Sequence, residues 1–212
     1  EGIQESAAGF DQVSLIETSD AHLIVAGSGA ISPSNPSDIV VAKFQFNGNL
    51  IWKKRFGGVG TDVVQDMIEG QDGKILITGS TSSIGSDSNN TGSSDILLLK
   101  IDLSGNLEWS KSFGNPMESE TGLSLAEDTD GKIAISGVSL VSGMELESKA
   151  IILKTDLSGN FNWASYFGDS QRQNSATDVY FINNDELIAI GYGNNSSNDL
   201  EAPIDGYIMS LN

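Results

Sequence analysis

Residues 102–109 read DLSGNLEW, and Phe113 and Gly114 follow four and five residues after the tryptophan. The same pattern of Gly-Asn, tryptophan and Phe-Gly occurs three times, around Trp52, Trp109 and Trp163. These tryptophans are 57 and 54 residues apart. A motif that returns at a nearly constant interval of this length indicates a repeat architecture.

A second motif, an apolar run that ends in glycine, divides the chain into four. Its glycines are Gly27, Gly79, Gly137 and Gly191, at intervals of 52, 58 and 54 residues. We therefore predict a single domain over residues 1–212 that contains four repeats. The repeats cover approximately residues 7–56, 57–113, 114–167 and 168–212, with residues 1–6 available to complete the last one.

Each repeat is predicted to contain four short strands, which we call a to d. In the second repeat they cover residues 62–69, 75–78, 95–101 and 107–113, where apolar runs are bounded by Gly, Asn, Asp and Ser. Residues 96–99 are apolar at every position, as expected for a strand that is covered on both faces. No segment shows sustained helical periodicity. The sequence therefore predicts an all-β fold, a β-propeller of four four-stranded antiparallel blades.

The conserved positions of the repeat also resemble a known family. The second repeat reads Asp-Gly-Lys, an apolar run and a glycine at 72–79, then Lys-Ile-Asp-Leu-Ser-Gly-Asn-Leu-Glu-Trp at 100–109 and Phe-Gly at 113–114. This pattern resembles the bacterial beta-propeller repeat family. The resemblance implies a propeller and a secreted or cell-surface location, and it says little about activity. The fourth repeat departs from the pattern, with Asn-Asp-Glu at 184–186 and Ser210 in place of the lysine.

The two ends of the sequence leave the closure of the propeller open. Asn212 aligns with a position before strand d of the fourth repeat, and residues 1–6 align with the tail of a strand d. An N-terminal strand beside the last blade would remove two exposed edges. The alternatives are a closed four-bladed ring, a segment of a larger propeller, or two chains that complete an eight-bladed ring. An open strand-d edge would also allow self-association.

Charge and composition exclude several classes of partner. Asp and Glu total 29 against 11 Lys and Arg, which gives a net charge of −18. Such a surface repels nucleic acid and anionic lipid, so neither is an expected partner. No apolar run approaches the roughly 20 residues that span a bilayer, and no membrane insertion is expected. The predicted location is extracellular or at the cell surface.

The sequence shows no recognisable catalytic motif. With no cysteine and one histidine, His22, thiol chemistry and multi-histidine metal sites are excluded. The Asp-x-Ser-Gly-Asn segments at 102–106 and 156–160 are interpreted as hairpin turns and not as calcium loops. We therefore predict no catalytic residue, no metal and no cofactor. Trp52, Trp109 and Trp163 are expected to pack between blades, and a carbohydrate platform is the alternative.

These observations predict a non-catalytic extracellular module for binding or scaffolding. Two alternatives stay open: a structural unit of a large surface or filament assembly, and a hydrolase with acidic residues in the central channel. Irregular b–c and d–a loops share one face, where we expect a protein or carbohydrate ligand to bind. The polar candidates there are Asp87, Asn89, Asn90, Glu118, Glu120, Asp169 and Arg172.

Overall fold

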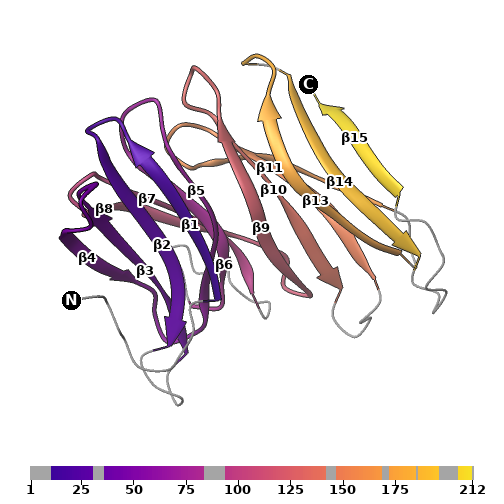
Figure 1. The fold of residues 1–212 in the computed structure, drawn as a ribbon. Coiled ribbons are helices and arrows are strands. Elements are labelled where there is room, and N and C mark those ends of the chain that lie inside the picture. The colour runs from indigo at the N-terminus through magenta and orange to yellow at the C-terminus, as the bar shows by residue number, and fades with distance from the viewer. Residues whose placement is uncertain are drawn as a thin grey trace.

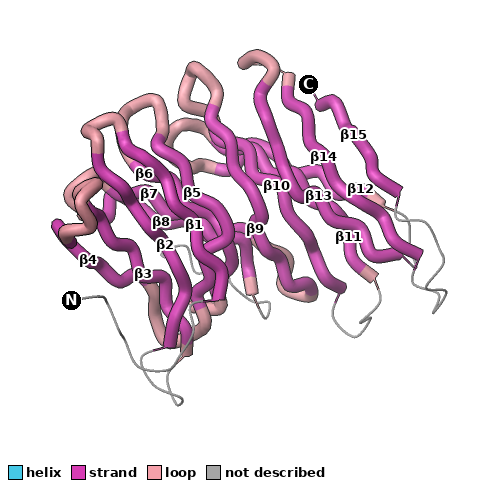
Figure 2. Tube along the Cα trace, viewed as in Figure 1, coloured by secondary structure: helices cyan, strands magenta, loops and turns pink. Residues whose placement is uncertain are grey.

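The computed structural model describes residues 11–30, 36–83, 94–141, 147–168, 172–184, 186–195 and 205–211. In these ranges all regular structure is β-strand (Figure 2), and no helix that could span a membrane is found among them. The strands are β1 (Asp11–Thr18), β2 (His22–Ala30), β3 (Ser37–Phe44), β4 (Leu50–Phe56), β5 (Asp62–Glu69), β6 (Ile75–Thr81), β7 (Asp95–Ile101), β8 (Leu107–Phe113), β9 (Glu118–Glu127), β10 (Ile133–Val141), β11 (Ser148–Thr155), β12 (Phe161–Phe167), β13 (Arg172–Phe181), β14 (Leu187–Asn195) and β15 (Asp205–Leu211).

The strands pair in sequence order, as expected for repeated antiparallel blades. Strands β1 to β4 form one four-stranded sheet, and β5 to β8 form a second. The remaining strands form a seven-stranded sheet, in which β9 to β12 and β13 to β15 are joined by a single parallel pair, Ser148 with Gln173. The first three repeats therefore each supply four strands, and the fourth supplies three within the described residues.

The sheets stand side by side along an open arc (Figure 1), with β1 to β4 at one end and β13 to β15 at the other. Of the alternatives for closure, a closed ring of four complete blades is therefore not observed in the described residues. Strand β15 is an edge strand, because the described part of the fourth repeat contains no strand d. Residues 1–6, the candidates for that position, lie outside the described residues.

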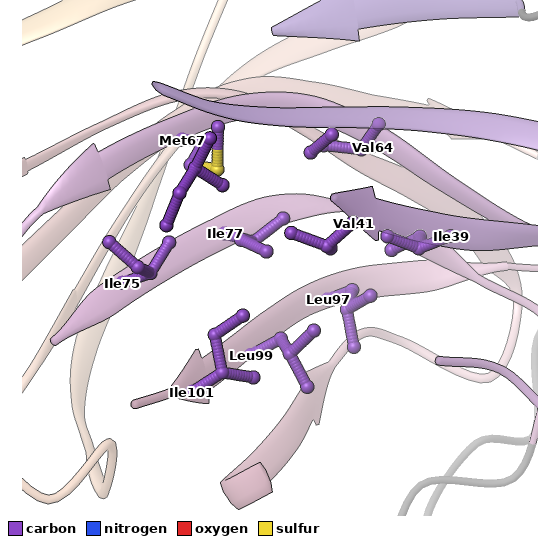
Figure 3. Close-up of a cluster of buried hydrophobic side chains, with 11 residues drawn as sticks. Ile39, Val41, Val64, Met67, Ile75, Ile77, Leu97, Leu99 and Ile101 are labelled. Carbon is purple, nitrogen blue, oxygen red and sulfur yellow. The ribbon is translucent and has the colours of Figure 1, made fainter. Parts of the chain in front are cut away.

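In the described part of the chain the hydrophobic core consists of three separate clusters, one between each pair of successive repeats. Successive side chains of a strand point to opposite faces, so the second and third repeats contribute to the clusters on both their sides, and the first and fourth repeats contribute to one each. In the first cluster, residues of β3 such as Ile39 and Val41 pack with Ile75 and Ile77 of β6 (Figure 3). The second cluster includes Leu76, Leu98 and Ile135, and the third includes Ile152, Val179 and Leu187.

The tryptophans connect each repeat to the next one. The Trp52 indole N–H donates to the carbonyl of Leu103, in the turn between β7 and β8, at 3.0 Å. A β-carbon on Gly105 of that turn would lie 3.0 Å from the Trp52 ring, and one on Gly159 would lie 2.8 Å from the Trp109 ring. Both glycines have a positive φ, so the backbone conformation and the close approach both require glycine.

The glycines of the second motif allow close contact within a sheet. Gly79 and Gly137 lie beside bulges in β5 and β9. A β-carbon at either position would overlap a backbone carbonyl, that of Val63 or Thr121 respectively. The glycine is needed there because the neighbouring strand bends toward it.

Candidate active site at the second blade junction

Two acids flank a glycine at the boundary between the first and second repeats, and again at the boundary between the second and third. We call the boundary between β1–β4 and β5–β8 the first junction, and that between β5–β8 and β9–β12 the second junction. Gly57 at the first junction lies between Asp38 and Asp62. Gly114 at the second lies between Asp95 and Glu120. In both cases a carboxylate oxygen of each acid lies within 3.0 Å of the position that a β-carbon on the glycine would take.

Local strand geometry explains why these acids are buried. Asp95 is the first residue of β7, and Glu120 follows the start of β9, so both side chains point into the space where two sheets meet. Asp95 is 2% exposed and Glu120 is 0% exposed. Because a buried carboxylate loses its hydration, it is costly unless hydrogen bonds or a cation compensate.

The hydrogen bonds at the second junction satisfy only part of this need. Glu120 Oε1 accepts from the backbone N–H of Asn115 at 3.1 Å and from the Ser139 hydroxyl at 3.5 Å. Glu120 Oε2 is buried with no hydrogen-bond partner, and so is Asp95 Oδ1. These are the two oxygens that flank Gly114. The pair therefore presents two unpartnered carboxyl oxygens at one point.

A third acid, Glu118, adds negative charge beside this pair. Its Oε1 pairs with Lys149 Nζ at 3.2 Å, and its Oε2 accepts a short hydrogen bond from Ser139. The Lys149 ammonium lies 5.7 Å from the centre of the Tyr166 ring. Glu118 is thus neutralised, while the described residues offer no cation to Asp95.

Burial and like charge shift the titration of these groups. Burial, together with the charges of Asp95 and Glu118, raises the pKa of Glu120 to about 7, although the Asn115 N–H opposes the shift. Burial also raises the pKa of Asp95. Two acids this close titrate as a pair, since ionisation of one disfavours ionisation of the other. Near neutral pH the pair retains a proton that it can donate.

A cavity of about 370 Å³ opens beside Asp95. Three aromatic residues line it, Phe113, Phe161 and Tyr166, and the last two are 58% and 43% exposed. Burial, with the charges of Glu120 and Glu118, raises the pKa of Tyr166, so its hydroxyl stays protonated. Aromatic faces beside a carboxyl group suit a ligand with apolar C–H surfaces and hydroxyl groups, such as a sugar.

The first junction has the same frame and different electrostatics. Arg55 forms a short ion pair with Asp38, whereas Ser112 occupies the corresponding position at the second junction. Asp62 accepts from the Ser83 hydroxyl at 2.7 Å and from the Gly58 N–H at 3.0 Å. The cavity there measures about 260 Å³. At the first junction Asp38 Oδ1 is also buried with no hydrogen-bond partner, but Arg55 neutralises that carboxylate. At the second junction each of the two acids has one such oxygen, and no cation of the described residues pairs with Asp95.

The structure places the candidates from sequence in different settings. Glu118 and Glu120 lie on the predicted face, but in strand β9 and buried, not on an exposed loop. Arg172 begins β13, and its side chain lies outside the described part of the structure. Asp87, Asn89, Asn90 and Asp169 lie outside the described residues.

Several residues of the site were not among the candidates from sequence. They are Asp95, Ser139, Lys149 and Tyr166. Alignment of the repeats contains a signal for one of them, because Asp38 and Asp95 both come directly before the apolar run of strand c. Within the described ranges, no group of three or more His, Cys, Asp or Glu side chains is arranged so that it could hold a metal ion.

The comparisons with known proteins give a fold and no family. No family model and no curated protein matches the chain. Among solved structures, it is similar to α-L-arabinanase from Penicillium chrysogenum in complex with arabinobiose, with 12% identity and a TM-score of 0.62 over 95% of this chain and 62% of that one. It is also similar to the polysaccharide lyase Uly1, with 11% identity and a TM-score of 0.54 over 93% of this chain and 49% of that one.

The chain thus spans less than two thirds of either of these proteins. At such identities the likeness shows the fold alone. The fold is all-β and of the β-propeller type, which confirms that part of the prediction from sequence. The finer assignment to the bacterial repeat family is not confirmed, because no family model matches.

The same comparisons correct the functional prediction. We expected a non-catalytic binding or scaffold module, and not an enzyme, because no catalytic motif was recognised. That prediction is wrong: both solved structures are enzymes that act on polysaccharides, which favours the hydrolase alternative. The missing motif was weak evidence, since glycoside hydrolysis requires two carboxyl groups and neither cysteine nor histidine.

Proposed function

We propose that the protein is a glycoside hydrolase whose active site is the second junction. The observation that carries the proposal is the Asp95–Glu120 pair, with one buried and unpartnered oxygen on each carboxyl group. A pair of carboxyl groups in unlike environments is the usual apparatus of glycosidic cleavage. The fold shared with polysaccharide-acting enzymes supports this reading.

The positions of the two acids suggest how they divide the chemistry. Asp95 lines the cavity, so its carboxyl group is the one that would contact the glycosidic oxygen. Glu120 does not line the cavity, and with a pKa of about 7 it is the group that would hold the proton before transfer. In the proposed step the proton passes to the leaving sugar oxygen and the glycosidic carbon–oxygen bond breaks. Water then adds to the anomeric carbon and gives up a proton, which restores the protonated acid pair.

Charge and lining residues define the substrate class. A net charge of −18 would repel an anionic polysaccharide, so we assign a neutral glycan. Phe161 and Tyr166 would stack against its sugar rings. A polymeric substrate of this kind is met outside the cell, and an extracellular or cell-surface location is part of the proposal.

The test is release of reducing sugar from a panel of neutral polysaccharides, with arabinan first because of the arabinanase fold. Asp95→Asn keeps the size of the side chain and removes its acid function. We expect it to lower the rate about 100-fold or more, as for loss of a general acid. The matched control is Asp38→Asn at the first junction, which should keep activity.

Thermal melting of both variants separates lost chemistry from lost folding. Equal loss of activity in Asp38→Asn and Asp95→Asn, at unchanged melting temperature, would remove the second junction as the active site. Folded wild-type protein that cleaves no neutral glycan, or cleaves only an anionic polymer, would overturn the proposal.

A further inference from the structure

The first repeat has an apolar face that no other part of the described structure covers. Val13 and Leu15 of β1 are 59% and 60% exposed. Beside them, Val25, Val40 and Phe44 line an apolar hollow of about 120 Å³. These side chains point away from the first core cluster, which contains their neighbours on the other face of the same sheet.

The corresponding face of the second repeat is buried. Leu15, Val25 and Phe44 correspond to positions in the second repeat that pack against the first. Those positions are Met67, Ile77 and Ile101, which are 2%, 0% and 0% exposed. The first repeat therefore carries half of a junction without the other half.

The turn between β3 and β4 shows the same vacancy. Gly48 corresponds to Gly105 and Gly159, against which the rings of Trp52 and Trp109 pack. Around the β-carbon position of Gly48 there is no atom within 4 Å, although its φ of +87° matches the other two. The turn therefore has the same backbone shape as the two turns against which a tryptophan of the preceding repeat packs.

A polar contact is also left unmade. Glu69 of the second repeat accepts from the Ser19 N–H of the first at 2.6 Å, and Glu127 of the third accepts from the Gln71 N–H of the second at 2.5 Å. Glu17 corresponds to Glu69 and Glu127. It is exposed, and no donor in the described part of the chain reaches it. Apolar and polar features of the junction thus agree.

The fourth repeat carries the complementary positions of strands β13 and β14, although its described part lacks the strand d that bears the tryptophan in the other repeats. Tyr180 is 72% exposed, and Ile190 and Tyr192 are 44% and 42% exposed. They point away from the third cluster, because the alternate residues Val179 and Ala189 are buried in it. Together with Ile188 they correspond to positions by which the second repeat contacts the third. Those positions include Ile68 and Leu76.

We infer that the chain associates head to tail, with the fourth repeat of one copy seated on the first repeat of another. The two faces are by register the two sides of a junction that the chain already makes three times internally. They are also apolar on a molecule of net charge −18, whose other surfaces repel a second copy. Exposed tyrosines are typical of interfaces that are covered only on association. Because the two faces differ, the contact is heterologous and gives a ring or an open chain of copies.

Two charge variants test this inference by analytical ultracentrifugation. Leu15→Glu blocks the face of the first repeat, and Tyr180→Glu blocks that of the fourth. Wild-type protein should associate as concentration rises, and each variant alone should sediment as a monomer. An equimolar mixture of the two variants should form a one-to-one dimer, because one intact face of each kind remains.

The controls make every outcome decisive. Val59→Glu changes a side chain that is 87% exposed and lies on neither face, so it should associate like wild type. Val13→Glu replaces Leu15→Glu if that variant melts at a lower temperature. A wild-type monomer at all concentrations would overturn the inference. So would association of either variant alone, which would indicate a contact between like faces.

Discussion

At the first junction Arg55 pairs with Asp38, whereas at the second junction the same position is Ser112 and no cation of the described residues pairs with Asp95. At both junctions a Phe-Gly pair connects the two repeats, two acids flank the glycine, and a cavity lies beside them. The frame is therefore common to the repeats, and the chemistry depends on a few positions within it. A change from arginine to serine leaves a buried acid pair uncompensated, and such pairs are where perturbed pKa values and function coincide.

Removal of the tryptophans tests the packing that both junctions share. Among the changes considered, it should have the largest effect on the free energy of unfolding. Trp109→Ala at the second junction and Trp52→Ala at the first should each lower the free energy of unfolding by about 3–5 kcal/mol, since a large ring is lost from a packed contact. Urea denaturation measures both losses. A loss under about 1 kcal/mol for either would mean that its ring is a surface feature and not part of the frame.

The pH dependence of stability separates the two junctions. Glu120 has a pKa of about 7 in the native protein and about 4.5 when unfolded. Between these values the unfolded chain has lost the proton that native Glu120 still holds. The contribution of Glu120 to stability is therefore full below pH 4.5 and falls as the pH rises to 7, by about 3 kcal/mol.

Urea denaturation at a series of pH values gives this slope. Glu120→Gln should abolish most of it, while Asp62→Asn at the corresponding position of the first junction should retain it. The same slope in wild type and Glu120→Gln would show that another group titrates there.

An exchange of the distinguishing residue should have a smaller effect. Ser112→Arg places a guanidinium where Arg55 stands at the first junction, beside Asp95. A cation at that distance lowers carboxyl pKa values by about one unit or more. The fall in stability should still begin near pH 4.5, which the unfolded chain sets, but end at lower pH, with a gain of about 1 kcal/mol at neutral pH. The reciprocal Arg55→Ser breaks a partly exposed pair and should cost less than about 1 kcal/mol.

The sequence predicted the fold because the fold depends on local patterns that recur. The interval between Trp52 and Trp109, and the apolar runs that end in Gly79 and Gly137, were enough to locate the strands. The three described strands of the fourth repeat agree with the alignment, in which Asn212 comes before strand d. That residues 1–6 complete this repeat stays a prediction, because they lie outside the described residues.

The candidate site was predicted only in part. Glu118 and Glu120 were named because they are acidic and close to a loop, and their burial depends on β9 starting at Glu118. The contacts of Ser139 and Lys149 with Glu118 join residues 21 and 31 positions apart, which only the packed sheets bring together. The importance of Ser112 can be seen only when the repeats are aligned and the structure shows that Arg55, at the same position, pairs with Asp38.

The division of the core into three clusters has a consequence for how the molecule comes apart. Each cluster joins only neighbouring repeats, so local stability is a sum of nearest-neighbour terms. The first and fourth repeats have one such neighbour and should open most often, as frayed ends. The second and third are each held on both sides, so the acid pair between them lies in the segment that opens least.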